Sequence, residues 1–209
     1  MRLILLVSLS LLLPCRLAWA GDKGKTPEEA FKAMQAAHDK GGPKAFLPYL
    51  TKDSQKALAG GMVVTIAGVR AMLAAKKGTL KETIESFDAF LKKHGVDLAK
   101  LKGRDKPPAS ADAAVAALIE AGSLPKEPAA FVEDAVTVLN ELSGTVKPLE
   151  LVPDDAVLKN VKITSDTAKG TMHYRLGDED KSDPIFFRRE AGLWRIDFIP
   201  NIRAPFSKK

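Results

Sequence analysis

The C-terminal part of the chain constrains the fold most, because it alternates apolar and polar side chains in four short runs. Successive side chains of a strand point to opposite faces of a sheet, and short joints favour antiparallel neighbours. The runs are Val157–Thr164, Ala168–Leu176, Pro184–Glu190 and Leu193–Ile199. The joints are Ser165-Asp166-Thr167, a polar loop at Gly177–Asp183, and Ala191-Gly192. The sequence therefore predicts an antiparallel sheet of about four strands.

This sheet is expected to have one apolar and one mostly polar face. The second run places on one side Gly170, Met172, Tyr174 and Leu176, and on the other Lys169, Thr171, His173 and Arg175. The last run places Trp194, Ile196 and Phe198 opposite Arg195 and Asp197. If Ala191-Gly192 is a two-residue turn, Ile185 and Phe187 join the tryptophan face. An apolar face of this kind needs a cover, which the preceding sequence can supply.

The preceding sequence, about residues 26–143, contains the start and stop signals of helices. Thr26-Pro27-Glu28-Glu29 combines a capping residue, a proline for the first turn and a capping-box glutamate, and Gly41-Gly42 ends that helix. Further helices are predicted to open near Thr79, Ser110 and Pro128. Ala57–Ala75 is very apolar, but its arginine and three glycines make membrane insertion unfavourable, so we predict a buried helix.

The first twenty residues have the pattern of a secretory signal peptide. A positive start at Arg2 precedes the apolar run Leu3–Leu13, and Ala18-Trp19-Ala20 offers small residues for cleavage after Ala20. The apolar run is short for an uncleaved membrane anchor. Cys15, the one cysteine, lies within this peptide, so the mature chain would have no disulfide and no thiolate metal site. We therefore expect an exported protein, periplasmic or secreted, with no transmembrane segment after cleavage.

The predicted fold class is α+β in a single domain at residues 21–209. Its helical portion covers about residues 26–143 and its sheet portion about 146–200, with the helices packed on the sheet. The chain has 32 basic and 26 acidic residues, for a net charge of +6. These charges are spread along the sequence, whereas nucleic-acid binding needs a concentrated basic patch with aromatic side chains. We expect no nucleic-acid partner.

Two segments carry a family resemblance. They are the opening helix Thr26–Phe31 with the following Gly41–Leu50, and the closing hairpin Phe186–Asp197 with its Gly-Leu-Trp-Arg-Ile-Asp ending. Both resemble the nuclear transport factor 2-like superfamily, the cone-shaped α+β fold shared with ketosteroid isomerase. That ending is similar to exported members with no assigned activity. The resemblance implies a cavity between sheet and helices, and by analogy a homodimer through the back of the sheet. The helical block at about 53–143 departs from the family pattern, and helices inserted there would fill or roof the cavity.

Family enzymes place a carboxylate or histidine and a hydroxyl donor inside the cone, but those catalytic positions do not align with this chain. No catalytic residue is therefore assigned. The residues alone offer one candidate ligand-binding cluster on the polar face of the sheet, where Asp197 would lie close enough to tune a histidine or an arginine. Its members are His173, Lys169, Arg175, Arg195 and Asp197. The alternative is a solvated sheet back with weak cross-strand ion pairs, which alternation alone produces.

No metal site or cofactor is predicted. The three histidines are far apart, and none has a His-x-x-x-His or His-x-x-Glu spacing. The functional expectation is an exported, non-catalytic domain that binds an unknown small molecule or protein partner. One alternative is a lyase or isomerase that uses general acid/base catalysis in the cone-shaped cavity. Another is an envelope-associated structural protein that adheres through its mild positive charge.

Overall fold

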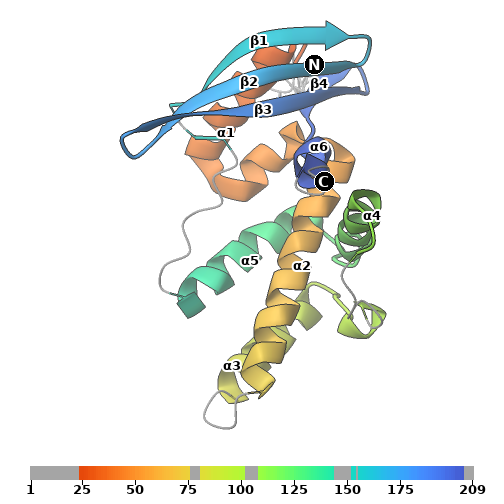
Figure 1. Cartoon of the computed structure of the whole chain (residues 1–209). Helices are drawn as coiled ribbons and strands as arrows, with labels where there is room; N and C mark the ends of the chain where they lie inside the picture. The colour runs from red at the N-terminus through yellow and green to blue at the C-terminus, as the bar shows by residue number, and fades with distance from the viewer. Residues whose placement is uncertain (1–23, 76–80, 102–107, 144–151, 154, 205–209) are drawn as a thin grey trace, which may run out of the picture.

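A computed structural model describes residues 24–75, 81–101, 108–143, 152–153 and 155–204 of the chain. Helices precede a C-terminal antiparallel sheet, so the predicted α+β class is confirmed (Figure 1). The helices are α1 (Pro27–Phe46), α2 (Lys52–Ala75), α3 (Lys81–Lys93), α4 (Ala111–Ala121), α5 (Pro128–Ser143) and α6 (Ile199–Arg203). Two short 3-10 helices are η1 (Leu47–Tyr49) and η2 (Leu98–Leu101). The predicted signal peptide and the helix start at Thr79 lie outside the described residues.

The strands form a simple meander in the order β1-β2-β3-β4. They are β1 (Val157–Thr164), β2 (Thr167–Leu176), β3 (Glu179–Glu190) and β4 (Leu193–Ile196). Glu190 pairs with Leu193, which leaves Ala191-Gly192 as a two-residue turn. Both turn residues have a positive φ, 51° and 83°, as the hairpin turn that follows the twist of the strands requires. The predicted turn is therefore confirmed.

The predicted polar loop at Gly177–Asp183 is wrong. Leu176 pairs with Glu179, so only Gly177 and Asp178 form the turn, and Gly177 supplies the positive φ of 64°. Both faces of this hairpin end are exposed to solvent. Its residues therefore need no alternation of apolar and polar side chains, although they pair as strands. The last strand is also shorter than predicted. It ends at Ile196, because Pro200 lies in the first turn of α6.

One face of the sheet is covered by α1, as predicted from alternation. The sheet contributes to the core the buried side chains Ala168, Met172, Ile185, Phe187, Trp194 and Ile196, and α1 contributes Ala30, Phe31 and Met34. Thr26 caps α1 by accepting a hydrogen bond from the Glu29 amide at 3.2 Å. The Glu29 carboxylate reaches back to the amide of Lys25. Gly42 has a positive φ of 61° and kinks the helix, where the sequence predicted its end.

The other long helices extend away from the sheet (Figure 1). α2 runs from the sheet outward, with α4 and α5 packed along it and α3 at its far end. Ser110 caps α4 by accepting a hydrogen bond from the Ala113 amide, as predicted. The prediction of a buried α2 is only partly right. Ala59, Val63 and Ile66 are buried, but Val64 and Met72 are 46% and 53% exposed.

α2 is the one helix among the described residues that is long and apolar enough to cross a membrane by length and composition. Only 28% of its most apolar 18-residue window is buried inside the protein. A core helix of a soluble protein passes the same test, so this finding alone does not assign α2 to a membrane.

Candidate functional site

The polar face of the sheet carries four of the five candidates, of which His173 and Arg175 line one hollow, and Asp197 follows the end of β4. Lys169 lies over the ring of Phe186, with its Nζ 5.5 Å from the ring centroid. Arg175 lies 3.8 Å from Asp180, an exposed pair that contributes little. Arg195 pairs in the sheet register with Arg188. These three side chains therefore do not converge on one point.

His173 is too far from Asp197 to be tuned by it. His173 pairs with Ser182 of β3, whereas the Asp197 amide donates to the carbonyl of Phe186. Ser182 and Phe186 are four residues apart in β3, which is about 13 Å along an extended strand. The His173 Nδ1 lies 2.9 Å from the Ser182 hydroxyl, and its Nε2 is buried with no hydrogen-bond partner among the described residues.

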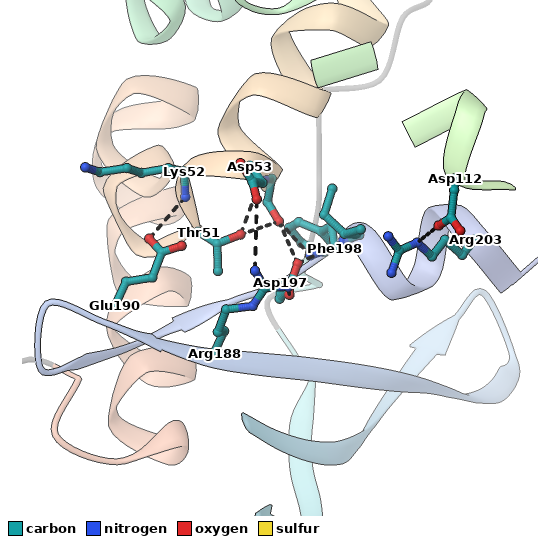
Figure 2. Close-up of polar contacts among 11 residues, drawn as sticks. Thr51, Lys52, Asp53, Asp112, Arg188, Glu190, Asp197, Phe198 and Arg203 are labelled. Carbon is teal, nitrogen blue, oxygen red and sulfur yellow. Dashed lines mark hydrogen bonds and ion pairs between the residues drawn. The ribbon is translucent and has the colours of Figure 1, made fainter. Parts of the chain in front are cut away.

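Asp197 belongs instead to a buried polar network at the N-terminus of α2 (Figure 2). The Ser54 hydroxyl donates to Asp197 Oδ1 at 3.2 Å, accepts from the Phe198 amide at 2.9 Å and accepts from the Thr51 hydroxyl at 2.7 Å. The Ile199 amide also donates to Asp197 Oδ1. The network thus fixes the start of α2 against the chain between β4 and α6.

The arginine that Asp197 engages is Arg188, which was not among the candidates. An Arg188 Nη2 lies 2.6 Å from Asp197 Oδ2, and its Nη1 lies 4.0 Å from Asp53 of α2. Glu190 accepts from the amide of Lys52 at 3.2 Å, so a second carboxylate meets the first turn of α2 (Figure 2). Since Asp197, Ser54 and Thr51 are buried and hydrogen-bonded to one another, we read this network as a structural clamp rather than a reactive site.

The clamp positions a groove between α2, α4 and α6, which we call the helix groove. Its volume is about 470 Å³, and its walls are mostly apolar. The lining residues are Ala57, Leu58, Met62, Leu118, Phe198 and Ile202, with Gly61 and the polar Ser54, Thr65 and Asn201. No charged side chain is among these residues. Arg203 of α6 lies 2.9 Å from Asp112 of α4, an exposed ion pair between two of the three walls (Figure 2).

A second groove lies on the other side of α6, against the apolar face of the sheet; we call it the sheet groove. Its volume is about 450 Å³, and it shares Phe198 and Asn201 with the helix groove. Its remaining lining residues are Pro153, Met172, Tyr174, Leu176, Asp183, Pro184, Ile185 and Ala204. Asn201 spans the wall between the two grooves, because its Nδ2 donates to the carbonyl of Pro184 at 3.2 Å.

The sheet groove contains one polar pair. The Tyr174 hydroxyl donates to Asp183 Oδ2 at 2.6 Å. This hydrogen bond, together with partial desolvation and the carboxylate charge, raises the pKa of Tyr174 above its ordinary value. The phenol therefore stays protonated and acts as a donor, and the carboxylate is the basic partner.

Neither member of this pair was among the candidates predicted from the sequence. Tyr174 was assigned to the apolar face, and Asp183 was placed in a loop. With Gly177-Asp178 as the turn, Met172 faces Asp183, and the carboxylate falls on the apolar side beside Tyr174. A glycine followed by aspartate between two strands is a known two-residue hairpin signal, which would have predicted this register.

Comparison with protein-family models, with curated proteins and with solved structures finds no match to this chain. Within the described residues, no group of three or more His, Cys, Asp or Glu side chains is placed to hold a metal ion. The chemistry of the two grooves is therefore the basis for a functional proposal.

Proposed function

We propose that this chain is an exported, non-catalytic binding domain that takes a small, mainly apolar molecule in the helix groove. The observation that carries the proposal is the lining of that groove, which is apolar and has no charged side chain among its residues. Ligand sites typically have volumes of about 300–1,000 Å³ and a few polar groups that orient the ligand. The helix groove fits this description, with Ser54, Thr65 and Asn201 as its polar groups.

The groove is also supported as a preformed site. Its walls are held by the Ser54–Asp197 network at one end of α2 and by the close backbone approach of α2 and α4 at Gly60. A ligand that enters fixed walls does not have to order them, so less of the interaction free energy is lost on binding. Removing apolar surface from water contributes about 25 cal/mol per Å².

The test is binding of N-phenyl-1-naphthylamine, an uncharged dye whose fluorescence rises in apolar surroundings. We expect saturable binding to the wild-type chain. Gly61→Leu should weaken it about tenfold or more, because the groove side of Gly61 is open and the new side chain fills part of the volume. Gly68→Leu is the matched control, since Gly68 lies two turns further along the same helix and also faces open space.

Equal effects of the two substitutions would remove the helix groove from consideration as the dye site. An absence of saturable binding to the wild-type chain would contradict the proposed function itself. Because both substitutions replace an exposed or half-exposed helical glycine, unfolding of one variant alone is not expected.

The resemblance to the nuclear transport factor 2-like superfamily remains part of this proposal. An α1 helix that covers the apolar face of a C-terminal antiparallel sheet is compatible with that fold, and the sheet groove lies beside that face. Export is proposed from the N-terminal sequence alone.

A second candidate function is a lyase or isomerase that works in the sheet groove. It is favoured by the Tyr174–Asp183 pair, which combines a hydroxyl donor and a carboxylate in a mainly apolar groove. Asp183 is exposed, however, so water competes with a substrate for its carboxylate. Deuterium incorporation α to the carbonyl of cyclohexanone in D₂O would support this candidate if Asp183→Asn abolished it. An exchange rate equal to that of buffer would exclude proton abstraction from this probe.

A further inference from the structure

We propose that the sheet groove is a second binding site, which takes a ligand with a positively charged amine on an apolar body. This site is separate from the helix groove, and the inference does not depend on the function proposed for that groove. It rests on the charge of Asp183, on the apolar and aromatic walls around it, and on the pairing of the neighbouring cationic side chains with other carboxylates.

Asp183 is the one charged residue among those that line the sheet groove. Its hydrogen-bond partner is the neutral Tyr174 hydroxyl, and no ion pair to Asp183 is present among the described residues. The neighbouring cations are paired with other carboxylates. Lys181 contacts Glu179, and Arg175 contacts Asp180 on the opposite face of the hairpin. A negative charge therefore lies in the groove without a cation from the described part of the chain.

The walls around Asp183 suit the rest of such a ligand. Met172 and Ile185 are 9% and 2% exposed and form an apolar floor, and Leu176 lies 59% exposed at the open end. The rings of Tyr174 and Phe198 also line the groove. Aromatic rings attract ammonium groups through their negative faces, and a nearby carboxylate adds a charge-assisted hydrogen bond. The volume of about 450 Å³ accommodates a molecule with a single aromatic ring.

The same features argue against a metal ion. Calcium takes six to eight oxygen ligands and magnesium close to six, whereas the described lining residues offer the one carboxylate of Asp183. An organic ammonium needs only one carboxylate, because its apolar body supplies the remaining contacts. The structure thus favours an amphipathic amine over an inorganic cation.

The test compares 4-phenylbutylamine with 4-phenylbutan-1-ol, which share an apolar body and differ in charge. Binding is followed by the methyl resonances of Met172 and Ile185 in NMR titrations of the wild-type chain at low salt. We expect the amine to bind about tenfold more tightly than the alcohol, as for a charge-assisted hydrogen bond to a carboxylate. The preference should shrink in 0.5 M NaCl, where the charge is screened.

Two variants assign the preference to Asp183. Asp183→Asn keeps a hydrogen-bond acceptor for Tyr174 but removes the charge, and it should bring the affinities for amine and alcohol together. Asp180→Asn is the matched control on the same hairpin, and it should leave the preference unchanged because Asp180 lies on the opposite face.

Equal binding of the two probes to the wild-type chain would overturn the proposal, and this comparison needs no variant. The proposal would also be overturned if both variants lost the preference for the amine to the same extent. Resonance shifts confined to residues of the helix groove would overturn it as well. Binding of N-phenyl-1-naphthylamine in the helix groove tests a different site, so failure of one proposal is distinguishable from failure of the other.

Discussion

Two glycines allow α2 and α4 to touch through their backbones. A Cβ atom at Gly60 would lie 1.9 Å from the carbonyl oxygen of Leu118, and one at Gly122 would lie 1.7 Å from that of Lys56. Both separations are far below van der Waals contact, so any side chain at either position must move the helices apart. The two sites therefore fix the distance between two walls of the helix groove.

This contact predicts opposite effects of alanine at neighbouring glycines of α2. Gly60→Ala should lower the free energy of unfolding by about 1–3 kcal/mol or more through overpacking. Gly61→Ala should leave it unchanged or raise it by about 0.5–1 kcal/mol, because a Cβ there meets open space and alanine favours the helix. Urea denaturation of the two variants measures both values. A similar result for the pair would contradict the close approach of α2 and α4.

The contact between α3 and α5 includes a carboxylate whose titration affects stability. Asp134 lies 2.6 Å from the Lys93 ammonium and 3.0 Å from the His94 ring, which is itself buried between Phe90 and Phe131. The hydrogen bond from Lys93 is the main cause that lowers the pKa of Asp134, and the His94 bond adds to it. A lowered pKa in the folded chain means that the folded state favours the carboxylate form.

Asp134→Asn should therefore destabilise the chain at pH 7 but not at strongly acidic pH. The contribution of Asp134 is present above its unfolded pKa of about 3.9 and is lost as the pH falls through the lower folded value. Urea midpoints at pH 7 and pH 3 measure the difference between variant and wild type. Glu133→Gln is the control, since Glu133 has no ion pair among the described residues. A difference in urea midpoint between variant and wild type that is the same at both pH values would exclude a contribution from the titration of Asp134.

At the scale of elements, α2 is held to the sheet by its first turn. Ser54 occupies the centre of that junction, because its hydroxyl contacts Thr51, Asp197 and the Phe198 amide. The packing of α2 against α4 and α5 then extends outward from this junction. Loss of the Ser54 hydroxyl would leave several buried polar groups short of a partner.

Ser54→Ala should lower the free energy of unfolding by about 2 kcal/mol or more, since each buried group left unpaired costs about 1–3 kcal/mol. Ser123→Ala is the control, because the Ser123 hydroxyl bonds the carbonyl of Ile119 at an exposed helix end and its loss should cost within about 0.5 kcal/mol. Both are measured by urea denaturation. Equal costs would show that the junction does not depend on the Ser54 hydroxyl.

Alternation predicted those strands whose two faces differ in environment. Trp194, Ile196 and Phe187 share the covered face, and their pattern gave the correct β3–β4 turn. Alternation could not predict the start of β3 at Glu179, because both faces of that hairpin end are solvated. The burial of Asp197 could not be predicted from local sequence either, because its partner Ser54 lies 143 residues earlier in the chain. The grooves depend on helix packing, such as the Gly60–Gly122 contact, which no local pattern encodes.

At the scale of the whole molecule, α2 links the sheet to the outer helices and leaves apolar side chains exposed along the way. Its hydropathy would also suit a membrane span. Insertion would, however, separate α2 from α4 at Gly60 and break the Arg70–Asp88 ion pair, whose atoms lie 2.5 and 2.9 Å apart. An arginine inside a span also costs free energy, about 2.5–3.5 kcal/mol when it lies at the centre.

We therefore predict that the chain is cleaved and released rather than anchored. Expressed with its own N-terminus in a Gram-negative bacterium, it should lose residues 1–20 and appear in the osmotic-shock fraction. Intact-mass spectrometry and a carbonate-washed membrane pellet measure these two outcomes. Ala20→Phe is the control, because a large residue at the cleavage position should keep the chain uncleaved and in the membrane fraction through its apolar run Leu3–Leu13. A cleaved chain that stays in the washed pellet would instead make α2 a membrane segment, and the helix groove would then face lipid.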